Sequence, residues 1–489
     1  MMCQPLNAIY SRVYGIHKSA LRRIAEDSCS LRAIENIDQH SIMYENILIK
    51  NATVVNEGKS FIGDVLLADG RIEQIGTIDP EPHHQVIDAT GKHLFPGIID
   101  GQVHFRDPGL THKGDLYTES KAAIAGGVTS FIDMPNTVPN ILTIESLRDK
   151  YEIASKKSLA NYSFFLGVNA DNIDEVIKMD TSQFIGVSDD GLYFTKKGNL
   201  LADQPETMEK LFANCSSIIA IHSEKEEIVE ENERLYKEKY GADIPAKFHP
   251  LIRNTKGCYE ATKRAIELAK KHQARLHILH LTTEAETHLF QNDLPLQDKK
   301  ITTEVSVHHL WFSDKDYDRL GMLIKWNPAI KTEEDRAGLF KALLDDRIDI
   351  ITTDHAPHTL EEKEQAYFQS MSGAPMVQHS LNCMLEFYKR DLISLEKIVE
   401  KMCHNPSILY KMTHRGFIRK GYYADLTLVD LNKNWTVAKD NLLYKCGWSP
   451  LEGTLFQTEI QQTFVNGHLV YDKGHFSKEQ KGKEIEFGT

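Results

Sequence analysis

The sequence has no long apolar run and no excess of positive charge. No apolar stretch approaches the roughly 18 residues that a transmembrane helix needs, so we expect no membrane association. The formal net charge is −13 at pH 7, which argues against a nucleic-acid groove and against attraction to anionic membranes. We therefore expect a small-molecule substrate rather than a nucleic acid or a membrane as the partner.

Cysteines are few and show no pairing pattern. The seven are scattered, odd in number and without CxxC spacing, which is typical of reduced, mostly buried thiols in a cytoplasmic protein. A GxGxxG motif after the first strand of the central region is also missing, so a dinucleotide site is not expected.

The length suits more than one small domain. A chain of 489 residues can hold a barrel of about 250 residues plus accessory structure, and 26% charged with 41% hydrophobic residues is ordinary globular composition. The first 42 residues differ from the rest. Residues 11–23 are basic and weakly amphipathic, but Glu26 and Asp27 follow, unlike an acid-poor transit peptide. We expect residues 1–42 to be a disordered extension, or an upstream start before a natural beginning near Met43.

Strand-like segments occur at both ends of the remaining chain. Three β-branched or apolar runs lie between residues 47 and 67, separated by turn residues, and similar segments return at 424–430 and 463–470. We predict one small β-sandwich domain assembled from residues 43–95 and 412–475.

The middle, residues 96–411, alternates apolar strands with charged helical segments such as 224–240 and 259–272. This pattern is typical of an α/β protein with a parallel sheet. Eight such units favour a closed TIM-like (β/α)8 barrel over an open doubly wound sheet. The expected strands are 97–105, 129–136, 162–169, 184–190, 217–224, 275–281, 301–312 and 348–358.

The last of these strands carries the most informative motif. It delivers one carboxylate and two imidazoles, Asp354, His355 and His358, to its carboxyl end. In a β/α barrel that end faces the active site, where an aspartate beside histidines can bind a metal, act as a base, or do both. Taken alone, the segment could equally be a turn that caps a helix. Four other strand ends carry similar residues, which favours a site.

Histidines and aspartates recur at those other strand ends. Isolated strand-end histidines are often structural, but five ligand-type side chains at one barrel mouth favour a divalent metal. Imidazole with carboxylate suits zinc that keeps an open position for water. The five candidate ligands are His104, Asp190, His222, His280 and Asp354.

Arg106 indicates an anionic substrate. It alternates with Gln102 and His104 on the first strand, so all three share one face. A guanidinium matches a carboxylate with two parallel hydrogen bonds. Asn136 and Asn327 can supply amide donors and acceptors beside it, although each is next to a proline and could be a turn residue.

In this order the motifs resemble those of dihydroorotases, the longer class I enzymes of the amidohydrolase superfamily. The resemblance runs from about Met43 to Gly474. Single motifs are shared with hydantoinases and allantoinases, whereas the arginine after the histidine, the Asn136 loop and the Asp-Asp-Gly together point to dihydroorotase. The motifs are His104-Phe105-Arg106-Asp107-Pro108-Gly109, Met134-Pro135-Asn136-Thr137, Asp189-Asp190-Gly191, Asn327-Pro328 and Thr353-Asp354-His355-Ala356-Pro357-His358.

The resemblance implies substrate-binding roles for Arg106, Asn136 and His358, with Asn327 at the pyrimidine ring and His104 beside them. It also implies that Asp190 takes the bridging position of the metal site. His222 and His280 complete that metal set, with His104 and Asp354 close by.

One position departs from the family pattern. The first strand of the family carries Asp-x-His-x-His, and here Gln102 replaces the first histidine. A neutral amide oxygen binds zinc far more weakly than imidazole, so one of the two usual metal positions is weakened. The carboxylated lysine of related enzymes is also absent. We expect one or two zinc ions per chain.

The function implied is reversible cyclisation of N-carbamoyl-L-aspartate to L-dihydroorotate in pyrimidine synthesis. A metal-activated water would attack the ring, with Asp354 as general base and then general acid. One alternative is a hydantoinase- or allantoinase-like enzyme, in which Arg106 would lack a carboxylate partner. Another is a non-catalytic homologue, for which the loss of the first histidine would be typical. The sequence is compatible with a homo-oligomer and leaves metal count and reaction direction open.

Overall fold

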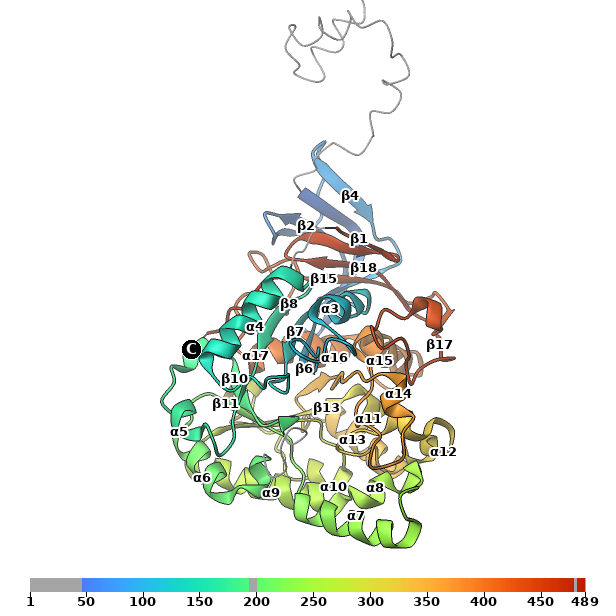
Figure 1. Ribbon diagram of the computed structural model, residues 1–489. Coiled ribbons are helices and arrows are strands. Elements are labelled where there is room, and N and C mark those ends of the chain that lie inside the picture. Colours follow the sequence, from blue (N-terminus) through green and yellow to red (C-terminus); the bar gives the residue numbers. More distant parts are fainter. Residues whose placement is uncertain (1–45, 193–199, 479–481, 489) are drawn as a thin grey trace, which may run out of the picture. The chain divides into compact units, whose positions relative to one another are not determined.

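The computed structural model describes residues 46–192, 200–478 and 482–488. The extension predicted over residues 1–42 lies outside them. From Asn46 onward the chain forms one compact unit, with a large β-sheet beside a central α/β barrel (Figure 1). In the described part, no helix combines the length and apolarity needed to cross a membrane.

The large sheet joins the two ends of this unit. Strands from residues 46–96 pair with strands from residues 426–476, and the junction is the antiparallel pair β5–β15. This confirms the predicted β domain built from both ends of the chain. In spatial order the strands are β20 (His475–Phe476), β19 (His468–Asp472), β18 (Glu459–Val465), β15 (Leu426–Asp430), β5 (His93–Pro96), β1 (Asn46–Asn56), β2 (Lys59–Ala68) and β3 (Arg71–Gly76), with β4 (His84–Asp88) also paired to β1.

Side chains from both ends of the chain share one apolar core in this sheet. Val54 and Leu67 from the first strands pack with Leu428 and Phe464 from the last ones. The β2–β3 turn is tight, with φ of 49° at Asp69 and 78° at Gly70, as a two-residue hairpin of the primed type requires.

Two threonines attach the sheet to the barrel. Thr427 Oγ1 donates a hydrogen bond to the Gly127 carbonyl at 2.8 Å, and Thr463 Oγ1 donates to the Ile124 carbonyl at 2.8 Å. Both carbonyls lie at or just after the end of helix α3 (Leu116–Ala125), so the two hydroxyl groups connect the sheet to this end of the helix.

The barrel strands are parallel. They form one run of three and one of six, and β8 and β9 are a single segment interrupted at Phe165. The ring closes where Val103 bridges to His355 and the His104 N–H donates to the His355 carbonyl at 2.8 Å. The α/β fold with a TIM-like barrel is thereby confirmed. The strands are β6 (Ile98–Val103), β7 (Val128–Asp133), β8 (Asn161–Phe164), β9 (Leu166–Gly167), β10 (Gly186–Ser188), β11 (Ile218–Ile221), β12 (Arg275–Ile278), β13 (Ile301–Ser306) and β14 (Ile350–Thr352).

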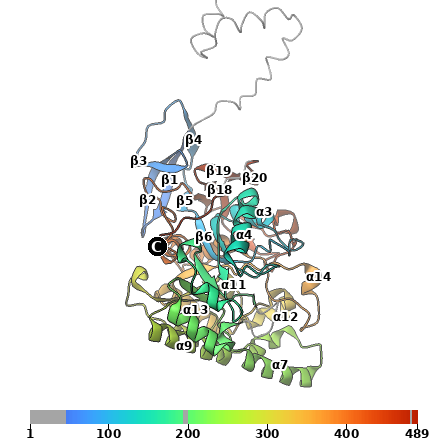
Figure 2. The ribbon, with the colours of Figure 1, turned by 60° about the vertical axis from the view of Figure 1, so that its left-hand side comes forward.

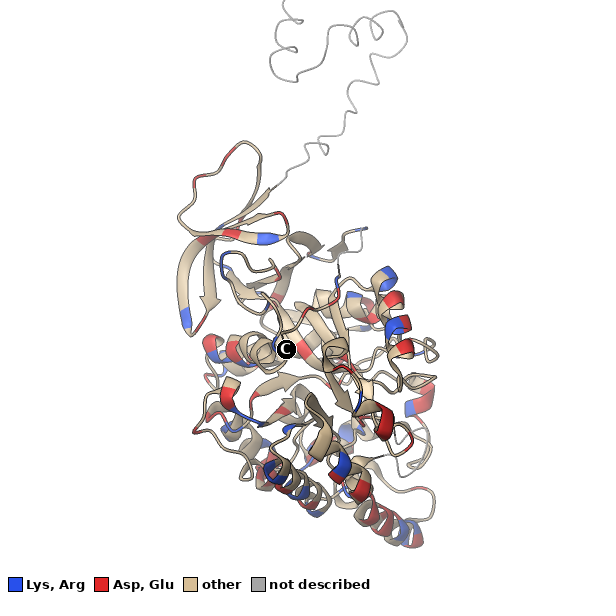
Figure 3. Cartoon of the chain, turned by 90° about the vertical axis from the view of Figure 1, so that its left-hand side faces the viewer, with Lys and Arg blue, Asp and Glu red and all other residues tan. Residues whose placement is uncertain are grey.

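Charged helices cover the outside of the barrel. Figure 3 shows the charged residues concentrated on the helices, whereas the strands are largely uncharged. Helices α7 (Glu226–Tyr240) and α9 (Thr255–His272) form where helices were predicted and lie together at the outer edge (Figures 1 and 2). Other long helices are α4 (Ile144–Lys157), α6 (Pro205–Asn214), α13 (Glu333–Leu344) and α15 (Ser380–Lys389).

The strand predicted over residues 301–312 is too long. β13 ends at Ser306 and a short helix, α11 (Val307–Trp311), follows directly. His308 is fully buried and stacks on Trp326 with ring centroids 4.0 Å apart. Because buried residues continue without a break, the sequence offers no periodicity change to mark the end of the strand. The division of the compact unit into domains 43–95 with 412–475 and 96–411 stays a prediction.

Candidate metal centre

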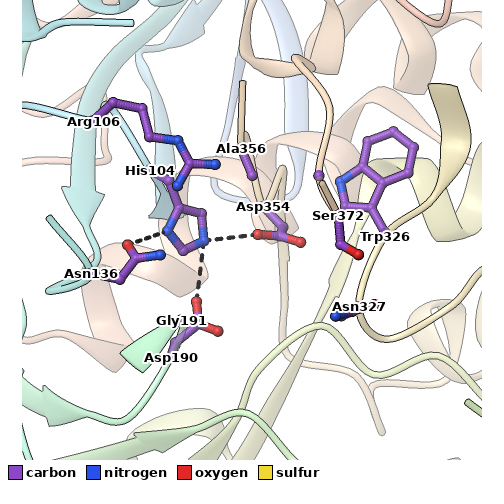
Figure 4. Close-up of a pocket in the computed structure, with 11 residues that line it drawn as sticks. His104, Arg106, Asn136, Asp190, Gly191, Trp326, Asn327, Asp354, Ala356 and Ser372 are labelled. Atoms are coloured by element: carbon purple, nitrogen blue, oxygen red, sulfur yellow. Dashed lines mark hydrogen bonds and ion pairs between the residues drawn. The ribbon is translucent and has the colours of Figure 1, made fainter. Parts of the chain in front are cut away.

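The predicted site residues converge where the barrel strands end. Figure 4 shows side chains that line the pocket at this point. His222 and His280 follow β11 and β12, are 0% and 1% exposed, and are not among the residues that line this pocket. Among the described residues, the lining consists of His104, Arg106, Asn136, Asp190, Gly191, Trp326, Asn327, Asp354, Ala356, Ser372 and Gly373.

Three site residues adopt left-handed backbone conformations. φ is 67° at Arg106, 36° at His280 and 45° at Asp354. Side chains other than glycine rarely adopt such values, which cost on the order of 1–3 kcal/mol each. Neighbouring contacts hold the last of these bends: Thr353 donates to Asp100 through its hydroxyl at 2.6 Å and its N–H at 3.1 Å.

Gly191 explains part of the Asp-Asp-Gly motif. Its φ is 70°, and a Cβ there would lie 2.0 Å from Asn136 Nδ2. Only glycine lets the loop after β10 approach the Asn136 side chain this closely, so the motif brings Asp190 and Asn136 to the same pocket.

Asp190, His222 and His280 form the first candidate metal group, here called the His222 group. His222 Nδ1 lies 3.6 Å and His280 Nε2 lies 3.7 Å from Asp190 Oδ1, and the two nitrogens are 3.1 Å apart. Ligand atoms of a tetrahedral metal with bonds of about 2.0–2.1 Å lie about 3.3 Å apart. The three separations therefore fit one ion.

Glu224 orients His222. Glu224 Oε2 accepts a hydrogen bond from His222 Nε2 at 2.8 Å and is paired with Arg253. Because Nε2 donates to Glu224, Nδ1 is the nitrogen that can bind a metal together with Asp190 and His280. A carboxylate in this position fixes the tautomer of a ligating histidine and raises its basicity. Glu224 was not predicted as a site residue, although its spacing of two from His222 at a strand end was a usable signal.

His104, Asp190 and Asp354 form a second candidate group, the His104 group. His104 Nδ1 lies 2.7 Å from Asn136 Oδ1, an acceptor, and therefore carries a hydrogen. His104 Nε2 lies 3.0 Å from Asp354 Oδ1 and 3.2 Å from Asp190 Oδ2 (Figure 4). A lone pair facing two carboxylates is repulsive, so this position needs a proton on Nε2 or a bound cation.

Gln102 also contacts the carboxylate of Asp190. Its Nε2 donates to Asp190 Oδ2 at 3.0 Å. The two oxygens of Asp190 therefore have different partners. Oδ1 faces the two histidines of the His222 group, whereas Oδ2 accepts a hydrogen bond from Gln102 and faces His104. At the position where the family pattern has an imidazole, this chain places an amide donor.

The pKa values reflect this concentration of opposite charges. Burial alone would lower the pKa of His104 and His222, but the carboxylates around them raise it to about 9 and about 10. Burial would raise the pKa of Asp190, yet hydrogen bonds from three histidines hold it well below its ordinary value. Burial raises the pKa of Asp354 despite the opposing effect of His104. A carboxyl group with a raised pKa suits a group that must take up and return a proton.

Arg106 lines the same pocket as His104. Its guanidinium lies next to His104 (Figure 4). Nε donates to the Pro357 carbonyl at 3.1 Å, and Nη2 lies 3.1 Å from His358 Nε2. His358 is therefore one contact away from the pocket, whereas Asn327 lines it as expected. Ser372 and Gly373 also line it, and no motif in their segment indicated this.

Comparison with known proteins agrees with this arrangement. The sequence profile of the amidohydrolase family matches residues 93–470. The chain belongs to the amidohydrolase family. This amidohydrolase is 32% identical over 440 residues to the dihydroorotase of Pyrococcus furiosus, covering 88% of this chain and 96% of that protein. It is 30% identical over 458 residues to the allantoinase of Bacillus velezensis, covering 91% and 97%. The solved structure of the L-hydantoinase (dihydropyrimidinase) from Arthrobacter aurescens matches with a TM-score of 0.82 and 26% identity, covering 90% and 99%.

These comparisons confirm the resemblance to dihydroorotases and identify the amidohydrolase as a cyclic amide hydrolase that acts on a small molecule. Its relatives are named for three different substrates. Similarity therefore identifies the kind of reaction, whereas the identity of the ring that is cleaved depends on the side chains of the pocket.

Proposed function

We propose that this amidohydrolase is a dihydroorotase that interconverts N-carbamoyl-L-aspartate and L-dihydroorotate in pyrimidine synthesis. The observation that most favours this function is Arg106, whose buried guanidinium lines the pocket. Among the described residues, its guanidinium donates to the Pro357 carbonyl and lies 3.1 Å from the His358 ring, and it makes no hydrogen bond to a carboxylate. A guanidinium matches a carboxylate with two parallel hydrogen bonds, so a ring carboxylate would give Arg106 a hydrogen-bonded anionic partner in the pocket. Hydantoin and allantoin lack that carboxylate.

A second candidate is the hydrolysis of hydantoin or allantoin. The allantoinase and hydantoinase relatives favour it. Neither substrate offers Arg106 a carboxylate to bind, so this candidate ranks second.

We assign the metal to the His222 group, with His104 and Asp354 adjacent. Two imidazole nitrogens and one carboxylate oxygen suit zinc with an open position. The fit is supported by the ligand spacing and by Glu224, which accepts from His222 Nε2 and so leaves Nδ1 as the ligand atom. Zinc bound there would activate a water by lowering its pKa from near 16 toward roughly 7, and would polarise the scissile carbonyl.

The side chains of this chain do the rest of the chemistry. Asp354 takes a proton from the attacking water and returns it to the departing ring nitrogen. Its Oδ1 is engaged by His104, and Figure 4 shows the second oxygen turned away from His104. Arg106, Asn136 and His358 hold the substrate carboxylate, which fixes the ring in attack geometry. Asn327, on the other side of the pocket, contacts the ring.

The test is a comparison of substrates on one zinc-loaded preparation. Initial rates are measured with L-dihydroorotate, hydantoin and allantoin, and with dihydrouracil, which has the dihydroorotate ring without its carboxylate. We expect kcat/KM for dihydroorotate to exceed the others by at least about tenfold, because a lost hydrogen bond to a charged group costs about 1.5–3 kcal/mol. Preference for hydantoin or allantoin would establish the second candidate. No activity with a full complement of zinc would indicate a non-catalytic homologue.

Two further expectations accompany this proposal. The five cysteines among the described residues are all free and buried or half-buried, as in a cytoplasmic enzyme. A homo-oligomer remains compatible with the sequence.

A further inference from the structure

A buried lysine lies behind the proposed carboxylate-binding residues and has no role in the mechanism above. Lys113 is 4% exposed, and its Nζ lies 3.0 Å from His358 Nδ1 and 2.9 Å from Glu362 Oε1. On its other side, the His358 ring meets Arg106 Nη2, 3.1 Å from Nε2. The imidazole is thus held between two cationic side chains.

These contacts cannot all be hydrogen bonds at once. An ammonium group and a guanidinium group have only donors. A neutral imidazole has one lone pair, so it accepts from Lys113 at Nδ1 or from Arg106 at Nε2, but not from both. A doubly protonated ring between two cations is disfavoured, and burial together with Arg106 and Lys113 keeps the pKa of His358 well below its ordinary value. The choice of tautomer therefore depends on which donor prevails.

Lys113 is the better-anchored donor. Glu362, which holds it, is itself fixed by the capping box of helix α14 (Leu360–Lys363): Glu362 Oε2 accepts from the Thr359 N–H at 3.0 Å, and the Glu362 N–H donates to Thr359 Oγ1 at 3.2 Å. Arg106, in contrast, already donates through Nε to Pro357 and borders the open pocket, where its remaining N–H groups can turn to a ligand.

We propose that Lys113 is a positioning residue that sets the tautomer of His358. Lys113 donates to Nδ1, so that the ring hydrogen is on Nε2 and is presented toward the pocket side with Arg106. An anionic ligand then meets two donors, the guanidinium and the Nε2–H. In the other tautomer, Nδ1–H would face Glu362 Oε2, 3.4 Å away, and Nε2 would turn a lone pair toward the anion. The inference rests on the proposed function only in naming a ring carboxylate as that anion.

The tautomer can be read directly by ¹⁵N NMR of the full chain, zinc-loaded and labelled at histidine. The His358 signals are assigned by their loss in His358→Gln. We expect the ligand-free wild type to show a lone pair on Nδ1 and hydrogen on Nε2, and Lys113→Met, which keeps the length but not the charge, to show the reverse. Lys445→Met is the matched control, because Lys445 pairs with Asp115 at 2.6 Å near the same loop and has no contact with His358 among the described residues.

The outcomes separate clearly. Hydrogen on Nδ1 in the wild type overturns the proposal whether or not any variant folds. An unchanged tautomer in Lys113→Met, or an equal change in Lys445→Met, also overturns it. We further expect Lys113→Met to lose about 10- to 100-fold in kcat/KM for dihydroorotate, mostly through KM, and Lys113→Arg to recover most of it. Because the tautomer is read without ligand, failure of the wild type to hydrolyse dihydroorotate would refute the proposed function alone.

Discussion

Gln102 should leave this protein with one tightly bound metal ion per chain instead of two. A second ion, in the His104 group, would need Asp190 Oδ2 as a ligand, and that oxygen accepts the Gln102 Nε2–H at 3.0 Å. A hydrogen bond to a charged group contributes about 1.5–3 kcal/mol, which corresponds to a factor of about 10 to 100 in affinity. The missing imidazole ligand adds to this. The two dissociation constants should therefore differ by at least about 100-fold.

The assay is metal stoichiometry by mass spectrometry after identical zinc loading and dialysis. Wild type should hold close to one zinc per chain and Gln102→His close to two. Gln102→Leu is the control, because it removes the hydrogen bond without adding a ligand, and it should remain close to one. Turnover need not rise in Gln102→His, since the surrounding side chains are arranged around the amide.

Two results would refute this reasoning. Two tightly held ions in wild type, unchanged in Gln102→His, would mean that Gln102 or another residue completes the second position. Two ions in Gln102→Leu would mean that the hydrogen bond, rather than the missing imidazole, decides the stoichiometry.

Four other predictions concern single side chains. Arg106→Lys should fold normally but lose at least about tenfold in kcat/KM for dihydroorotate, because an ammonium cannot make the two-pronged contact; parent-like kinetics would exclude a carboxylate role. Asp354→Asn should lower kcat by about 10²–10⁴; retained zinc with retained turnover would refute the base assignment. Glu224→Gln should weaken zinc binding by about 10- to 100-fold, measured by chelator competition, and an unchanged constant would refute its orienting role. Asp190 and Glu224 overcome the effect of burial and raise the pKa of His222 to about 10, so below that pH zinc must displace a proton from His222. The dissociation constant for zinc should therefore fall about tenfold for each pH unit between roughly pH 6 and 9. A dissociation constant that does not change with pH in that range would contradict this.

The site residues that could be predicted are those whose position follows from strand geometry. Gln102 and His104 are two residues apart at the end of β6, and both reach Asp190, as the period of a strand predicts. Arg106 lies beyond the strand, where its φ is 67°. Asp190 and Asp354 could be predicted because parallel strands in a barrel end at one rim. These inferences need only the period of a strand and the direction of the sheet.

Contacts between distant loops could not be predicted in this way. Lys113 and His358 are 245 positions apart, and they meet only because β6 and β14 are neighbours where the ring closes. Neither side of the Lys113–Glu362 pair belongs to a periodic element that faces the pocket. The α11 helix was missed for a different reason, since a buried strand that continues into a buried helix has apolar residues throughout.

The arrangement around Asp190 links the sequence departure to the electrostatics of the site. Without a second ion, the carboxylates of Asp190 and Asp354 still need a positive charge between them, and His104 Nε2 lies 3.0–3.2 Å from both. Its pKa, raised to about 9 by these carboxylates against the effect of burial, means that a proton can provide that charge at neutral pH in the metal-free protein. Where the family pattern has an imidazole ligand, this chain has the amide of Gln102, which donates to Asp190 Oδ2. Gln102 and a protonated His104 can thus stabilise the shared carboxylate of Asp190 without a second ion, which leaves Oδ1 to bind the metal of the His222 group.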